Sequence, residues 1–236
     1  MVWLCGVSCS ILAETLPFLP RCGPDDAWCG LAAGGSYIDF LAPGILAQSV
    51  LFVAIFYGIA AIWERDLGVL HRYLVSPAPR SALVSGKALS SGTRALSQAI
   101  VIYVCAALMG VDLSFAPADI VCAVLFIALG AAMFSTFSLI IACIVRTRER
   151  FMGIGQVLTM PIFFASNAIY PIDLMPHWLK TVSSINPLTY EVDGLRAVML
   201  VGGRSSYGLG SDFAALAIVC VLMIAIATRM YPRMTR

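Results

Sequence analysis

Charged residues are scarce in this sequence: Asp, Glu, Lys and Arg make up 12% of its 236 residues, against 60% hydrophobic residues. A water-soluble domain carries roughly twice that share of charge, because water must solvate its surface. The shortage of charge excludes an ordinary soluble domain, and the sequence predicts a protein whose solvent is lipid. The formal net charge of +2 gives no electrostatic basis for binding nucleic acid.

The few charged residues avoid five long apolar runs. Each run approaches or exceeds the ~20 residues that an α-helix needs to cross the hydrocarbon layer of a membrane. The sequence therefore predicts an all-α bundle with five membrane-spanning helices, in the segments Phe40–Trp63, Ala88–Gly110, Pro117–Val145, Phe151–Tyr170 and Phe213–Thr228.

Two of the runs have features that distort a straight helix. The third is longer than a straight crossing needs, so we expect it to tilt or to extend beyond the bilayer, with Gly130 as its flexible point. The fourth contains Pro161, which predicts a kink. Ser166 and Asn167, near the outer end of that run, are available to satisfy the backbone groups that a kink frees.

No Asp, Glu, Lys, Arg or His lies in the interior of the five runs. A carrier driven by an ion gradient normally holds such a side chain inside the bilayer, although a charge there costs ~2.5 kcal/mol or more. If the protein moves a substrate against a gradient, the energy must therefore enter elsewhere. Uncharged polar residues of the runs either line a substrate path or form hydrogen bonds between helices: Gln48, Gln98, Thr136, Gln156 and Asn167.

Signals for nucleotide, metal and covalent chemistry are also missing. The segment Ser85–Ala88 lacks the upstream glycine and the hydroxyl residue of a phosphate-binding loop, so a separate ATPase would have to bind ATP and Mg²⁺. The two histidines, His71 and His177, fall on opposite faces of the membrane in the topology below, which argues against a metal pair. Ser135 and Ser138 have no base in any run, so we expect neither a bound cofactor nor enzyme activity.

Charge is distributed unequally between two sets of loops. One side, formed by Glu64–Lys87, Arg146–Arg150 and Arg229–Arg236 together with Arg94, holds 11 basic residues and three acids. The other side holds four basic residues and ten acids. Because basic loops remain in the cytoplasm, we expect the first side and the C-terminus to be cytoplasmic.

The first cytoplasmic segment contains a helical pattern. Between Glu64 and Val75 the leucines recur at helical spacing, and Pro77 and Pro79 then stop the helix. One interpretation is an amphipathic helix that transmits the motion of a docked domain to the adjoining spans. The other is a basic loop that binds lipid head groups.

The segment between the fourth and fifth runs is divided by Pro171, Pro176 and Pro187 into short apolar pieces. Prolines at these positions exclude one continuous helix. We expect short interfacial or re-entrant helices on the outer side. The interfacial anchors are expected to be Trp178, Tyr190 and Tyr207.

Several motifs occur in the same order as in a known family. The first group is Tyr37–Leu46 (YIDFLAPGIL), Trp63–Gly68 (WERDLG) and Leu74–Pro77 (LVSP). The second group is Phe151–Gly155 (FMGIG), Pro161–Phe164 (PIFF), Tyr170–Pro171, Leu174–Pro176, Asn186–Tyr190 (NPLTY) and Asp193–Arg196 (DGLR). From about Ser36 to the C-terminus, the sequence resembles the membrane subunits of type-two ATP-binding-cassette exporters, especially the daunorubicin-resistance-like drug exporters.

The resemblance implies a polytopic permease of the bacterial inner membrane that exports a hydrophobic or amphipathic drug, lipid or glycan. Its implied partners are a second permease copy, identical or different, and cytoplasmic nucleotide-binding ATPase subunits. The family's coupling helix corresponds to Glu64–Val75, and its outer re-entrant helices correspond to Pro171–Arg196. The residues assigned to coupling are Glu64, Arg65, Asp66, Gly68, Leu70, Arg72 and Leu74. The rival functions are an ATP-independent carrier or channel for small lipophilic molecules and a membrane scaffold that transports nothing.

Residues 1–35 depart from the family pattern. The family begins with an interfacial helix and a full first span, whereas here Glu14 and several prolines and glycines interrupt the apolar start. We expect a degenerate or truncated first span, with a signal peptide as the alternative, followed by a permease domain over residues 36–236. Cys22 and Cys29 could pair in an oxidising compartment, and the cysteines inside the runs are expected to be packing residues.

Overall fold

The computed structural model describes residues 37–68, 80–145, 147–169, 172, 175–201, 203 and 205–230. Over these residues the chain is helical, and pairing of extended backbone is limited to one bridge between Leu113 and Leu200. The all-α fold class expected from the apolar runs is confirmed. Residues 1–35, with Cys22 and Cys29, lie outside the described residues.

Four helices are long and apolar enough to cross a membrane: α3 (Tyr37–Asp66), α5 (Arg80–Leu108), α6 (Pro117–Ile144) and α10 (Leu209–Met230). They correspond to four of the five predicted runs. With 28 residues, α6 is about 42 Å long, which exceeds the roughly 30 Å of hydrocarbon. The helix continues through Gly130 without a break, so that residue is not a point of interruption.

The fourth predicted run is shorter in the structure. α7 (Arg148–Phe164) has 17 residues, about 25 Å, and it does not reach the length of the four candidate spans. Pro161 lies in its last turn, and the hydroxyl of Ser166 donates to the carbonyl of Phe163 at 2.6 Å. Ser166 therefore satisfies a backbone group at the helix end, as expected, while the prediction of five spans is confirmed for four.

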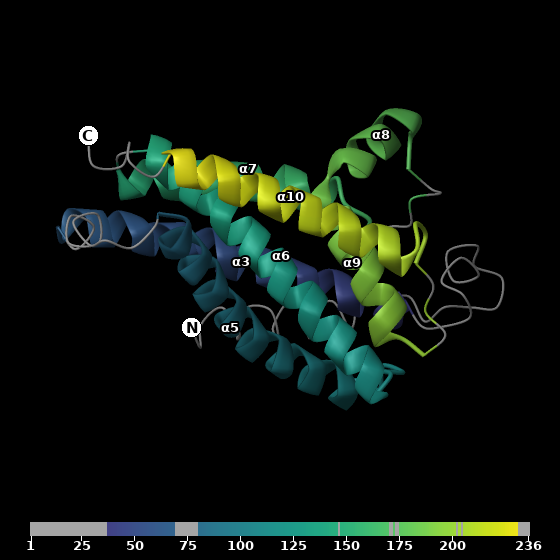
Figure 1. Ribbon diagram of the computed structural model, residues 1–236. Coiled ribbons are helices and arrows are strands. Elements are labelled where there is room, and N and C mark those ends of the chain that lie inside the picture. Colours follow the sequence, from purple (N-terminus) through teal and green to yellow (C-terminus); the bar gives the residue numbers. More distant parts are fainter. Residues whose placement is uncertain are drawn as a thin grey trace.

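Two short helices, α8 (His177–Ile185) and α9 (Pro187–Met199), form in the proline-divided outer segment. α9 begins where its sequence supplies start signals: Pro187 takes the first helical position, and the side chain of Asn186 accepts from the amide of Leu188 at 3.1 Å. Figure 1 shows α9 at one end of the bundle among α3, α6 and α10, whereas α8 projects away from it.

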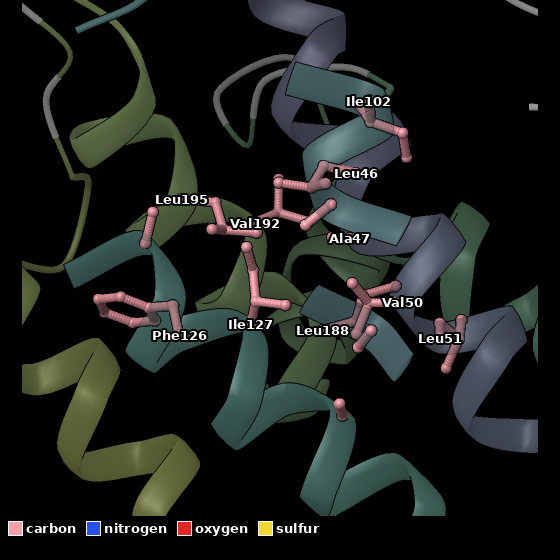
Figure 2. Close-up of a cluster of buried hydrophobic side chains, with 14 of the residues drawn as sticks. Leu46, Ala47, Val50, Leu51, Ile102, Phe126, Ile127, Leu188, Val192 and Leu195 are labelled. Carbon is pink, nitrogen blue, oxygen red and sulfur yellow. The ribbon is translucent and has the colours of Figure 1, made fainter. Parts of the chain in front are cut away.

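α6 forms the centre of the bundle, with α3, α5, α9 and α10 packed around it (Figure 1). Figure 2 shows Val192 and Leu195 of α9 pointing toward Leu46 of α3 and Ile127 of α6. All four side chains are buried. Apolar packing therefore holds α9 inside the bundle, although α9 is too short to span a membrane.

Candidate functional site

The end of α3 forms one candidate site. Glu64, Arg65 and Asp66 form the last turn of α3, and the amide of Gly68 donates to the carbonyl of Arg65 at 3.0 Å. Gly68 has φ +72°, a left-handed conformation that favours glycine and ends a helix. The predicted helix Glu64–Val75 is therefore wrong at its start, because its first three residues belong to α3 and a turn follows them. The other predicted coupling residues, Leu70, Arg72 and Leu74, lie outside the described residues.

Ion pairs connect this end of α3 to the beginnings of α5 and α7. Lys87 of α5 pairs with Glu64, and Arg148 of α7 donates to Asp66 at 2.9 Å. The Arg148 guanidinium also lies 4.0 Å from the centre of the Trp63 ring. The Lys87–Glu64 pair is half-buried and the Arg148–Asp66 pair is exposed. Ion pairs that water can reach contribute little stability, so the main effect of the two pairs is to fix three helix ends relative to one another. The described residues Glu64, Asp66, Lys87 and Arg148, which the charge pattern assigned to one face, therefore lie together.

A second polar cluster surrounds Asp193 of α9. Its buried carboxylate accepts hydrogen bonds from the backbone amides of Ser206 and Tyr207 at 2.6 and 3.2 Å. The hydroxyls of Ser205 and Ser206 each donate to it at 3.1 Å, and the amide of Asn167 donates at 3.4 Å. Donors of this number stabilise an ionised carboxylate away from water. Asp193 therefore anchors both the loop before α10 and the segment after α7.

Arg196, one turn further along α9, adds a charged contact to this cluster. It donates to the backbone carbonyl of Asn167 at 2.9 Å, and its guanidinium lies 3.8 Å from the centre of the Phe40 ring. Burial lowers the pKa of Arg196 to about 10, while Asp193 acts in the opposite direction, so the side chain remains charged at neutral pH. Arg196 therefore ties α9 to α3 and to the end of α7.

Glu191 of α9 differs from these residues, because neither carboxylate oxygen has a hydrogen-bond partner in the described part of the chain. The side chain is fully buried and lies directly against Gly130 of α6. A buried carboxyl group therefore lies against the third apolar run, although the interiors of the runs themselves contain no ionisable residue. Glu191 was not among the predicted site residues, because α9 lies outside the five runs. A signal was present, since Glu191 shares a helical face with Leu188 and Leu195, which are core residues.

Comparison with known proteins identifies the family of this chain. A family model described as ABC-2 type transporter matches residues 26–200, more than half of the sequence. The chain belongs to the ABC-2 type transporter family. The family expected from the sequence motifs is thereby confirmed.

Relatives of this ABC-2 type chain carry the names of transport and nodulation proteins. The chain is 30% identical over 162 residues to the putative transport permease ycf38 of Cyanophora paradoxa, covering 68% of this chain and 56% of the relative. It is 27% identical over 225 residues to nodulation protein J of Rhizobium leguminosarum bv. trifolii, covering 94% and 84% respectively. It is 23% identical over 241 residues to the inner membrane transport permease YadH of Escherichia coli K12, covering 98% and 89%. The chain thus spans little more than half the length of the ycf38 protein.

The candidate path residues of this ABC-2 type chain lie on different elements. Gln48 is half-buried on α3, and Gln98 is buried on α5. Thr136 donates to a carbonyl one turn earlier in its own helix at 2.6 Å. Asn167 belongs to the cluster around Asp193. Thr136 and Asn167 therefore have hydrogen-bonding roles within the protein.

Gln156, the remaining candidate, is exposed on α7 and lines a shallow groove between α3 and α7. Apolar side chains form most of the wall, including Phe52, Ile55 and Phe56 of α3. Of the predicted path residues, Gln156 is the one that the structure places on an open apolar surface.

Proposed function

We propose that this protein is the permease subunit of an ATP-driven exporter that moves a hydrophobic or amphipathic compound, such as a drug, lipid or glycan, out across the plasma membrane. Family membership and the transport-permease names of its relatives support this function. A separate nucleotide-binding subunit binds ATP and Mg²⁺ in this proposal, and the C-terminus faces the cytoplasm.

The ion-pair network at the ends of α3, α5 and α7 is the observation that carries the proposal. A force applied after Gly68 reaches α3 directly, α5 through Lys87 and α7 through Arg148. The segment Glu64–Gly68 is therefore a suitable attachment point for the ATPase subunit. The residues assigned to coupling by the family resemblance begin in this segment and continue beyond it.

A second permease copy completes the transporter in this proposal. Large apolar side chains on α7 are exposed and need a cover of lipid or another subunit: Met152, Ile154, Val157, Met160 and Phe164. The groove beside Gln156 is assigned to the substrate path, because an apolar wall with few polar groups suits lipophilic molecules.

Reconstitution with the nucleotide-binding subunit tests this function. We expect the full-length protein to bind that subunit and to raise its rate of ATP hydrolysis in lipid vesicles. Gly68→Arg should abolish both this stimulation and export without reducing membrane insertion. Gly68→Asn is the matched control, because asparagine tolerates positive φ, and it should retain both activities. Unchanged export by Gly68→Arg would contradict docking at this segment.

An ATP-independent carrier is the second candidate, and the buried carboxyl of Glu191 favours it. Ionisable side chains at membrane depth are typical of transport driven by ion gradients. Export that stops without ATP and continues after the proton gradient is collapsed supports the ATP-driven exporter. The reverse pair of results supports the carrier.

A further inference from the structure

The contact between α6 and α9 is built around a glycine and a carboxyl group. Gly194 of α9 lies against the ring of Phe126, and one turn away Glu191 lies against Gly130. A Cβ atom at position 130 would collide with the Glu191 carboxylate. Gly130 therefore provides the space that the carboxyl group fills, which explains a glycine in the middle of an unbroken helix.

This contact lies deep in the bundle. Gly130 is the fourteenth of the 28 residues of α6, so it stands about 20 Å from either end of a helix that is about 42 Å long. The last residue of α9, Met199, accepts a hydrogen bond from the amide of Ser114 in the loop before α6. Glu191 is eight residues earlier, about 12 Å further from that loop. α9 thus carries the carboxyl group from the outer end of the bundle toward the middle of α6.

The charged neighbours of α9 do not compensate Glu191. The ionisable groups near this end of the packed elements are Asp39 on α3, Asp119 on α6, His177 and Lys180 on α8, Asp212 on α10, and Asp193 and Arg196 on α9 itself. None of them forms a hydrogen bond with either carboxylate oxygen of Glu191. A buried carboxylate without partners is far less stable than the neutral acid.

We propose that Glu191 is a proton-binding site that controls the contact between α6 and α9. With the proton bound, the neutral carboxyl group stays buried against Gly130. When the proton passes to water, the charged carboxylate must be hydrated, and α9 separates from α6. This site acts on the conformation of the chain, so it depends neither on the identity of the cargo nor on that of the ATPase.

The sign of the pH dependence follows from the two environments of Glu191. Burial raises the pKa of Glu191 well above its ordinary value in the closed contact, whereas a hydrated glutamate has a pKa of about 4.3. Between these two values the closed contact holds one more proton than the open one. The closed contact is therefore most stable at low pH, and its opening constant increases about tenfold for each pH unit in that window.

Infrared spectroscopy of the full-length protein in lipid nanodiscs tests the protonation itself. The C=O stretching band of a protonated carboxyl group should be present at pH 7 in the wild type and reduced in Glu191→Gln, which keeps the shape of the side chain. An unchanged band in the variant would overturn the proposal.

Hydrogen exchange of the α9 amides tests the link to conformation. In the wild type, the opening constant should increase with pH by about tenfold per unit more than in Glu191→Gln, which has no proton to release. The variant is the matched control because both proteins share the intrinsic pH dependence of amide exchange. The same pH course in both proteins would contradict control of the contact by this proton.

Gly130→Ala tests the contact by a second route. The added methyl group collides with the carboxyl group, so exchange in α9 should be faster at every pH. Gly130→Ala combined with Glu191→Ala removes the collision and should restore slow exchange, with the same pH dependence as in Glu191→Gln. Equal exchange in Gly130→Ala and the wild type, or no rescue in the double variant, would overturn the geometry. The infrared comparison needs neither of these variants, so it tests the proposal even if Gly130→Ala fails to accumulate in the membrane.

Discussion

Replacing Gly58 of α3 by alanine tests whether the close approach of α3, α6 and α7 stabilises the fold. A Cβ atom at this position would lie 2.6 Å from Phe151 Cζ on α7 and 3.0 Å from the carbonyl oxygen of Ser138 on α6. It would also collide with the Ser138 hydroxyl, which donates to the carbonyl of Ile55 at 2.5 Å. Phe151 and Ser138 are both buried, so neither can move aside without moving a helix.

Gly58→Ala therefore has opposing effects on stability. Overpacking costs about 1–3 kcal/mol, and loss of the Ser138 hydrogen bond costs about 0.5–1.5 kcal/mol. Within a helix, alanine stabilises the folded state by about 0.5–1 kcal/mol relative to glycine. The expected net change is a loss of roughly 0.5–4 kcal/mol in the free energy of unfolding.

Unfolding of the purified protein by SDS in mixed micelles measures this free energy. Gly86→Ala on α5 is the matched control, because no atom lies within 4 Å of its added Cβ. Its free energy of unfolding should increase by up to about 1 kcal/mol. Ser138→Ala in the Gly58→Ala background should recover part of the loss, since the Phe151 contact remains. Equal stability of Gly58→Ala and Gly86→Ala would refute the close packing of these three helices.

Substitutions at three further positions test the two ends of the bundle. Arg148→Ala should reduce stimulation of the ATPase subunit, and Arg148→Lys should restore only part of it, because lysine lacks the planar stack on Trp63. A wild-type rate in Arg148→Lys would argue against the stack. Asn186→Ala should lose about 1 kcal/mol of helix capping and speed hydrogen exchange in the first turn of α9, whereas Asn186→Asp should preserve that turn. Asp193→Asn should speed exchange of the Ser206 and Tyr207 amides, and unchanged exchange would contradict its anchoring role.

The length of apolar runs predicted four of the helices because a bilayer leaves the backbone no water to bond, so a long apolar segment must satisfy its own polar groups as a helix. The same rule placed the end of α7 too far along the chain, at Tyr170 instead of Phe164. Its apolar composition continues past Phe164, but the backbone leaves the helix soon after Pro161 and turns through Ser166. Hydropathy does not report where such a turn falls.

The length of apolar runs could not predict the surroundings of Asp193 and Glu191. Asp193 and Glu191 are two residues apart in the sequence, and counting charges places both on the outer surface. In the structure both are buried, yet Asp193 has five donors and Glu191 has none in the described residues. The donors come from Asn167 and from the loop before α10, which are distant in the sequence. Only the tertiary contacts distinguish the hydrogen-bonded carboxylate of Asp193 from the unpartnered carboxyl group of Glu191.

α7 connects the two candidate sites mechanically. Its first residue, Arg148, belongs to the ion-pair network, and near its other end the carbonyl of Ile162 accepts a hydrogen bond from the side chain of Asn186 at 2.6 Å. Asn186 also caps α9, so displacement of the Arg148 end is transmitted along a helix of about 25 Å to the start of the helix that carries Glu191.

Force from a docked ATPase and occupancy of the proton site would therefore act on the same contact between α6 and α9. Linkage between two such sites is reciprocal. A proton that stabilises the Glu191 contact must oppose the displacement that docking produces, and docking that opens the contact must release the proton. A buried carboxyl group beside Gly130 is consequently compatible with a motor-driven exporter: the proton sets how much of the ATPase's work is needed to move α9, without itself supplying that work.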